Sequence, residues 1–396
     1  MSPDSAARRY FISKPKISVK DGNVALLVGT RKGGFLLRSS HNREKWKLEG
    51  PFLLGAIAHN MILDPRDGHT LLMAASTGHL GPTIFRSTDQ GRTWKEAARP
   101  PAFPKVEPEG TGEAINHTFS LWPGHVDEPG VFYAGTSPVG LFRSEDSGET
   151  WNGVAGFNEN PMRRTWIGPA EFAAPGGGGL HSLQIDPRDP AHMYIGCSMG
   201  GVFESLDQGK SWQPLNKGCE ADFLPDPEAD FGHDPHTLRI HPLYPDVLYQ
   251  QNHCGIYRMD REDGYWVRIG SNMPADVGDI GFPIVLDPRD PQRVWVFPMD
   301  CTEIWPRTSP KGKPAVYVST NGGKNWESLH KGLPARHGYF TVKRHAMNAD
   351  RQAPLGIYFG TSAGQVWGSV DEGKRWRKLV DYLPEIYSIE PVVFAA

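Results

Sequence analysis

Histidines recur at one offset along the chain, and their spacing could hold a metal ion. Four of them stand six residues before a proline that closes a short apolar run: His59, His117, His181 and His236. Imidazole nitrogens bind transition metals, and four neutral ligands leave the metal its full charge for Lewis-acid or O₂ chemistry. The pattern therefore predicts one transition-metal ion on these histidines, with iron preferred and zinc, copper, nickel or manganese also compatible.

A second recurring pattern indicates the elements that must position the histidines. The pattern S-x-[DN]-x-G-x-x-W ends at Trp94, Trp151, Trp212, Trp326 and Trp376, and degenerate copies end at Trp46 and Trp266. In such a segment the Asp or Asn side chain accepts hydrogen bonds from turn N–H groups, the glycine takes a conformation that other residues resist, and the tryptophan packs on the neighbouring repeat. We therefore interpret the repeated residues as structural.

These segments resemble the Asp-box, or BNR, repeats of sialidase-like β-propellers, and the resemblance covers nearly the whole chain from about residue 22. Seven units with a period of about 50 residues imply an all-β fold, a seven-bladed β-propeller of four-stranded blades with Asp-box turns. Segment 387–395 is expected to supply the missing strand of the first blade and close the ring. We expect a single propeller over 21–396, preceded by an extension over 1–20 that is disordered or reaches a neighbouring subunit.

In a propeller the first strand of each blade lines the central channel, so equivalent positions form a ring around the axis. The same face should carry polar loops and connections too long to be mere linkers. Acid/base candidates there are His253, His79, Glu303 and Asp300. Candidates for substrate binding are Arg31, Arg164, Trp166, Tyr339, Phe282 and Asn252. We expect a small-molecule substrate.

Composition excludes some partners. Lys and Arg number 42 against 45 Asp and Glu, for a formal charge of -3, which argues against nucleic acid and anionic membranes. Residues 1–20 lack the apolar core of a signal peptide, and the four cysteines show no CxxC spacing, so we expect a cytoplasmic protein with reduced thiols. A homo-oligomer is compatible with the sequence.

Three functions compete. The histidine ring favours a metal-dependent enzyme, an oxidoreductase of the oxygenase type or a hydrolase, that activates O₂ or water for attack on a small organic substrate. The alternative is a sialidase-like glycoside hydrolase, for which Asp300 and Glu303 are the candidate carboxylates; the Arg-Ile-Pro motif of sialidases is missing, because the corresponding region reads ALLVGTRKGGFLL. A non-catalytic binding or assembly platform is the third, and it has no use for a histidine ring.

Overall fold

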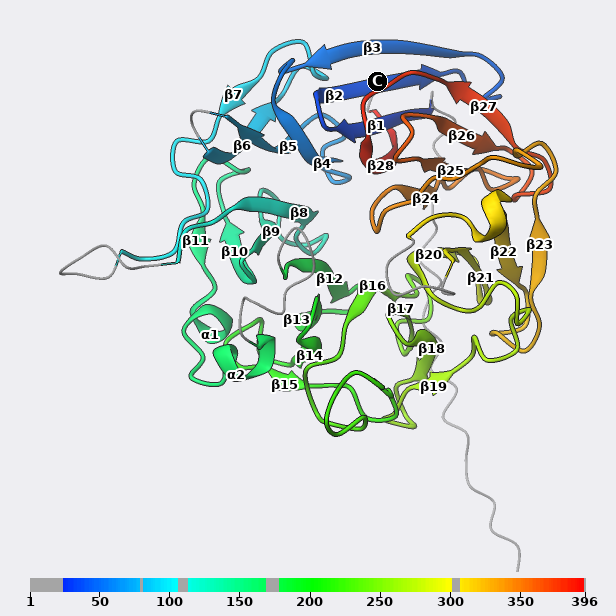
Figure 1. Ribbon diagram of the computed structural model, residues 1–396. Coiled ribbons are helices and arrows are strands. Elements are labelled where there is room, and N and C mark those ends of the chain that lie inside the picture. The colour runs from blue at the N-terminus through cyan, green and yellow to red at the C-terminus, as the bar shows by residue number, and fades with distance from the viewer. Residues whose placement is uncertain (1–23, 79–80, 106–112, 169–177, 301–306, 395–396) are drawn as a thin grey trace, which may run out of the picture.

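The computed structural model describes residues 24–78, 81–105, 113–168, 178–300 and 307–394. These residues form seven four-stranded antiparallel sheets arranged as blades around a central axis (Figure 1). The prediction of an all-β, seven-bladed β-propeller is confirmed. The proposed extension over 1–20 lies outside the described residues.

The first four blades follow the chain from its N-terminal side. Blade one contains β28 (Ile386–Val393), β1 (Val24–Thr30), β2 (Gly33–Ser39) and β3 (Trp46–Phe52). Blade two contains β4 (Ile57–Leu63), β5 (Leu71–Thr77), β6 (Gly81–Ser87) and β7 (Lys95–Glu96). Blade three contains β8 (His117–Pro123), β9 (Phe132–Ser137), β10 (Gly140–Ser144) and β11 (Asn152–Gly153). Blade four contains β12 (Leu180–Asp186), β13 (Asp189–Cys197), β14 (Gly201–Ser205) and β15 (Gln213–Pro214).

The remaining blades complete the ring. Blade five contains β16 (Pro235–Ile240), β17 (Val247–Asn252), β18 (Gly255–Asp260) and β19 (Val267–Arg268). Blade six contains β20 (Gly281–Asp287), β21 (Asp290–Pro298), β22 (Val316–Ser319) and β23 (Glu327–Leu329). Blade seven contains β24 (Met347–Ala349), β25 (Ile357–Gly360), β26 (Val366–Ser369) and β27 (Arg377–Val380). Short helices lie in the connections: α1 (Ala155–Asn158), α2 (Arg163–Ile167) and the 3₁₀ turn η2 (Pro310–Gly312).

The ring closes as expected, because the C-terminal strand β28 pairs antiparallel with β1 and sets Leu26 opposite Pro391. Closure gives blade one its fourth strand, and a closed ring leaves only short, protected strand edges. None of the helices among the described residues is both long and apolar enough to span a membrane.

Each Asp box is a turn stabilised by its own side chains. In blade two Ser87 Oγ donates to Asp89 Oδ1 and accepts from the Gly91 N–H at 2.9 Å, while Asp89 accepts from both the N–H and the hydroxyl of Thr93. These hydrogen bonds lower the pKa of Asp89 to about 2, with Thr93 as the main cause. The Asp89 carboxylate therefore accepts hydrogen bonds within the turn and serves a structural role. The boxes connect strands three and four of their blades.

Strand order places the boxes and the histidines on opposite faces. Successive strands of a blade are antiparallel, so the first and third strands run in one direction and the second and fourth in the other. The first and third strands therefore begin, and the second and fourth strands end, at the same face. We call this the upper face. The Asp boxes join strands three to four and lie on the opposite, lower face. Figure 1 shows β4, β8, β12, β16, β20, β24 and β28 nearest the axis.

His192 joins blade four to blade five through a mostly buried ion cluster. Its Nε2 lies 2.8 Å from Glu204 Oε1 and its Nδ1 lies 3.5 Å from Asp186 Oδ2. Arg261 of blade five binds the other Glu204 oxygen at 2.7 Å. Hydrogen bonds with Asp186 and Glu204 raise the pKa of His192 from 6.5 to about 9.

This cluster predicts a pH-dependent contribution to stability. Because the pKa is raised on folding, the stabilisation is complete below pH 6.5 and is lost as the pH rises through 9. We expect His192→Gln to lower the free energy of unfolding by about 1 to 3 kcal/mol at pH 6 and by less at pH 10, as measured by urea denaturation. His69→Gln, at an exposed histidine, is the control. An equal loss at both pH values would contradict this role.

Candidate active site at the central channel

The recurring histidine offset corresponds to a recurring backbone feature. The pairing of the first two strands shifts register at His59 in blade two, at His181 in blade four and at His236 in blade five. A β-bulge leaves one residue outside the ladder and re-aims its side chain. In blade three the shift lies at Phe119 instead, and His117 pairs directly with Ser137.

His59 and His117 stack on one another. Their ring centroids are 4.5 Å apart with nearly parallel planes. The ring of Tyr387, which lies on β28, is 5.7 Å from the His59 ring. His59 Nε2 lies 3.1 Å from Ser76 Oγ, and His117 Nδ1 lies 2.8 Å from Asn116 Oδ1. Burial lowers the pKa of His59 to about 3 and that of His117 to about 4, so both imidazoles are neutral.

His181 and His236 are buried in separate environments. His181 Nδ1 lies 3.0 Å from Ser182 Oγ, while its Nε2 has no hydrogen-bond partner among the described residues. His236 Nδ1 donates to the Gly281 carbonyl, and its Nε2 lies 3.4 Å from Asp234 Oδ2. Burial lowers the pKa of both imidazoles; for His236 the neighbouring Asp234 only partly opposes this.

The four histidines do not converge on a common point. Among the described residues, the potential ligand atoms of Asp234, His236 and His253 lie within 4.8 Å of one another, and no group of three or more includes His59, His117 or His181. The predicted ligand set of four is therefore not formed. A shared offset places the four side chains at the same level along the channel axis. It does not make them point toward one common centre, because the four consecutive blades occupy an arc of the ring.

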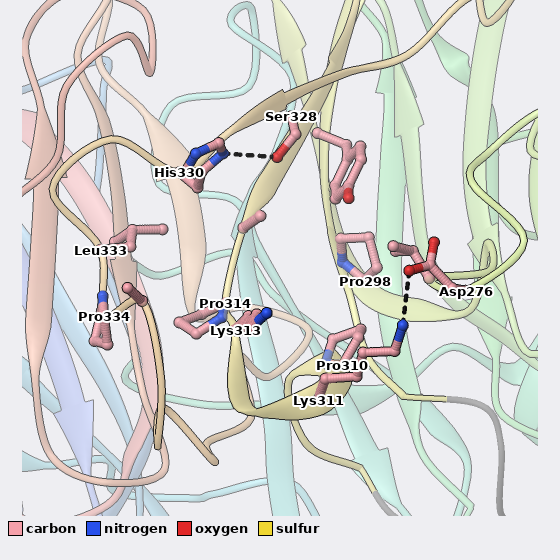
Figure 2. A pocket seen from close by; sticks show the side chains of 14 residues that line it. Asp276, Pro298, Pro310, Lys311, Lys313, Pro314, Ser328, His330, Leu333 and Pro334 are labelled. Atoms are coloured by element: carbon pink, nitrogen blue, oxygen red, sulfur yellow. Dashed lines mark hydrogen bonds and ion pairs between the residues drawn. The ribbon is translucent and has the colours of Figure 1, made fainter.

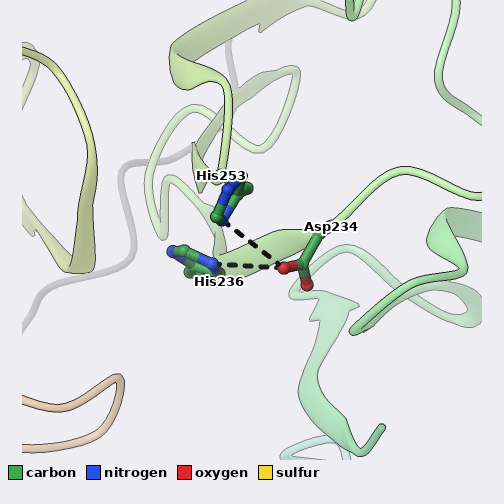
Figure 3. Close-up of side chains that lie close together, drawn as sticks. All are labelled: Asp234, His236 and His253. Atoms are coloured by element: carbon green, nitrogen blue, oxygen red, sulfur yellow. Dashed lines mark ion pairs between the residues drawn. The ribbon is translucent and has the colours of Figure 1, made fainter. Parts of the chain in front are cut away.

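Asp234 stands directly before β16, and one of its carboxylate oxygens faces two imidazoles, as Figure 3 shows. Its Oδ2 is 3.4 Å from His236 Nε2 and 3.8 Å from His253 Nδ1, and its Oδ1 has no partner among the described residues. Burial alone would raise the pKa of this carboxyl, but His236, Arg344 and His253 outweigh it and hold the pKa well below its usual range. Asp234 is thus a buried, ionised carboxylate with one oxygen that makes no hydrogen bond to the described residues.

Segment 343–345 crosses the channel from blade seven to blade four. His345 Nε2 lies 2.7 Å from the His181 carbonyl oxygen, and an Arg344 terminal nitrogen donates to Ser198 Oγ at 3.3 Å. The Arg344 guanidinium lies 4.9 Å from the centroid of the Phe282 ring. The segment therefore spans the channel and places the Arg344 guanidinium close enough to Asp234 to lower the pKa of its carboxyl.

A second polar cluster lies on the blade-one side of the same channel. Glu385 stands directly before β28 and binds Lys343 Nζ at 2.7 Å and the Tyr387 hydroxyl at 3.3 Å. The predicted substrate residue Arg31 lies 3.7 Å from the same carboxylate and is exposed. Burial would raise the pKa of Glu385, but Lys343 outweighs it and the pKa is lowered. Two ionised carboxylates, Asp234 and Glu385, thus start innermost strands at the upper face.

The other sequence-predicted site residues fall into three groups. Phe282 lies at the channel, 4.7 Å from the His236 ring, and His253 lies beside Asp234. Trp166 is buried against Phe203, and Asn252 is buried with its side chain on Gln250 and the Cys254 N–H. Arg164, Tyr339 and Asp300 lie outside the channel strands and are exposed or partly exposed. His79 and Glu303 lie outside the described residues.

Sequence reasoning missed Asp234, Arg344 and Glu385. Their signals are weak, since each is a single charged residue just ahead of a strand. The closest available signal was position, because Asp234 stands two residues before His236 and Glu385 directly precedes the closing strand. Only the ring arrangement brings these residues from blades five, seven and one to the same channel.

A comparison with known protein families finds the same repeat. The family model for the BNR/Asp-box repeat matches residues 317–328, one of the boxes described above. This propeller therefore carries the BNR/Asp-box repeat.

Relatives of this Asp-box propeller include glycoside hydrolases. An oligoxyloglucan-reducing end-specific xyloglucanase from Emericella nidulans is 24% identical over 75% of the chain and 38% of the relative. A xyloglucanase from Acetivibrio thermocellus is 25% identical over 66% of the chain and 31% of the relative. The chain thus spans less than half the length of these curated relatives.

Solved structures agree on the fold. The GH74 xyloglucanase from Xanthomonas campestris has a TM-score of 0.61 at 18% identity, covering 91% of the chain and 53% of that structure. YCF48 bound to D1 peptide has a TM-score of 0.50 at 14% identity, covering 86% of the chain and 96% of that structure.

These comparisons correct the predicted chemistry. The prediction of a metal-dependent oxygenase with a four-histidine iron centre is wrong, since the curated relatives of this Asp-box propeller are xyloglucanases. Glycosidic bonds are hydrolysed by paired carboxyl groups without a metal. The prediction of a transition-metal cofactor is therefore wrong, and the four histidines do not form its ligand set.

Proposed function

We propose that this Asp-box propeller is a glycoside hydrolase that cleaves an oligosaccharide at the upper end of its central channel. The observation that carries the proposal is Asp234, a buried and ionised carboxylate whose Oδ1 has no partner among the described residues. Glycosidases use such a carboxylate as a nucleophile or as a base toward water. The xyloglucanase relatives support the same class of reaction.

Arg344 and the two imidazoles lower the pKa of Asp234 and keep its carboxyl ionised. The Arg344 guanidinium favours the negative charge, and His236 Nε2 lies 3.4 Å from the carboxylate. Because the pKa of Asp234 is lowered, it does not act as the proton donor. It attacks the anomeric carbon or activates the water that does so, and the oxocarbenium-like transition state is stabilised by its charge.

The leaving oxygen needs a proton, and His253 is the proposed donor. It lies beside Asp234 on the turn after β17 and is partly exposed, and an imidazole can both give and take a proton. Glu385 and Tyr387, on the opposite side of the channel, are proposed to bind sugar hydroxyls.

His253→Gln should distinguish proton donation from a structural role. We expect kcat to fall about 100-fold for a natural oligosaccharide, whose sugar leaving group needs a proton, and far less for a nitrophenyl glycoside, whose leaving group does not. Equal losses on both substrates would contradict this role for His253. His69→Gln, at an exposed histidine on the turn between β4 and β5 and away from the channel, is the matched control.

The proposed function is tested by reducing-end release from a panel of xyloglucan, cello- and sialyl-oligosaccharides. We expect turnover of at least one neutral β-glucan oligosaccharide, unaffected by chelators. The alternative of a non-catalytic platform predicts no turnover of any sugar, and that result would overturn the proposal.

A further inference from the structure

A cavity of 380 Å³ lies on the upper face over blade six, away from the channel axis. It is bounded by the end of β21, by residues 310–315 directly before β22, by the end of β23 with the loop after it, and by the loop before β20, all of which lie at the upper face. Its volume falls within the range of about 300 to 1,000 Å³ that is typical of ligand sites.

The walls of the cavity combine rigid apolar surfaces with polar pairs at two ends (Figure 2). Pro298, Pro310, Pro314 and Pro334 supply apolar walls. Lys311 Nζ lies 2.8 Å from Asp276 Oδ2 at one end, and Ser328 Oγ lies 3.1 Å from His330 Nδ1 at the other. A sugar ring presents apolar C–H faces bordered by hydroxyl groups, so it matches both surfaces. Proline walls are fixed before binding and reduce its entropic cost.

A continuous set of contacts joins the cavity to Asp234. Tyr339, which is 65% exposed, lies against Gly312, where a β-carbon would be 2.7 Å from its ring. The Thr341 hydroxyl donates to the Arg307 carbonyl, and the Arg307 guanidinium lies 5.8 Å from the centroid of the Phe282 ring. Phe282 in turn contacts His236, the partner of Asp234.

From this arrangement we infer that the cavity is a distal subsite, which binds a sugar residue of the same oligosaccharide that is cleaved at Asp234. The inference rests on the proposed function and extends it, because it requires a substrate of several sugar units laid across blade six. Tyr339 and Arg307 then contact the intervening units, which gives Tyr339 the substrate-binding role expected from the sequence.

The test compares a long and a short substrate. Asp276→Ala and Lys311→Ala remove one polar end of the cavity, and Ala335→Trp reduces its volume; Asp276, Lys311 and Ala335 are all exposed. With a xyloglucan oligosaccharide of seven or more sugars we expect KM to rise about tenfold with kcat unchanged. With a nitrophenyl glucoside, which is too short to reach the cavity, neither constant should change. Lys374→Ala, the same charge change on the lower face, is the control.

The outcomes separate this inference from the proposed function. Hydrolysis by the wild-type protein with an unaltered KM in all three variants would overturn the subsite and leave the hydrolase proposal intact. Should the wild-type protein hydrolyse no oligosaccharide, calorimetric titration with the same xyloglucan oligosaccharide decides the subsite. Binding that weakens about tenfold in the variants would support the subsite without catalysis, whereas absence of binding would overturn both proposals.

Discussion

Asp234→Asn should lower kcat for oligosaccharide hydrolysis by about 1,000-fold while the propeller remains folded. Asn keeps the size of the side chain and its place beside His236 and His253, but it removes the negative charge on which nucleophilic or base catalysis depends. The loss should appear in kcat, because the charge is most important in the transition state.

The control for this variant is Asp230→Asn, which makes the same chemical change at an exposed aspartate four residues earlier. We expect it to leave kcat and KM unchanged. Thermal unfolding followed by circular dichroism should give a similar Tm for both variants. If Asp234→Asn retained more than about a tenth of the wild-type kcat, Asp234 would not be the catalytic carboxylate.

The largest expected loss of stability comes from an Asp-box tryptophan. Trp376 of blade seven is 2% exposed, packs its ring 5.0 Å from that of Phe359, and donates from Nε1 to the Leu329 carbonyl of blade six at 3.0 Å. Truncating a buried tryptophan removes its apolar contacts and leaves a cavity, and here it also leaves the Leu329 carbonyl without this donor. We expect Trp376→Ala to lower the free energy of unfolding by about 3 to 5 kcal/mol.

Tyr382→Ala, which removes an aromatic side chain that is 94% exposed, is the matched control. Urea denaturation should show little change for this variant. A loss below about 1 kcal/mol for Trp376→Ala would mean that the box tryptophans do not hold adjacent blades together.

The sequence predicted the fold well because the fold is repeated. Each Asp box is a local turn whose serine, aspartate and glycine contact one another within a few residues, as in 205–212. Seven such units leave few alternatives to a ring, and closure by the C-terminal strand follows because the first blade lacks a strand. The common histidine offset is likewise a real feature, since it marks the bulge in three innermost strands.

The chemistry of the site could not be predicted in the same way. An offset fixes how far along its strand a residue lies, but the direction of its side chain depends on neighbours from other blades. His59 stacks on His117, whereas His236 turns toward Asp234. Arg344 is distant from Asp234 in sequence and reaches the channel only because segment 343–345, just before the first strand of blade seven, lies against blade four.

Hydrolysis in water enriched in ¹⁸O tests the central claim most directly. The wild-type protein should convert a xyloglucan oligosaccharide into shorter products, and mass spectrometry should show one ¹⁸O atom at each new reducing end. Asp234→Asn should yield no labelled product under the same conditions. Absence of cleavage across the oligosaccharide panel, or cleavage without incorporation of ¹⁸O, would contradict the assignment of this propeller as a glycoside hydrolase.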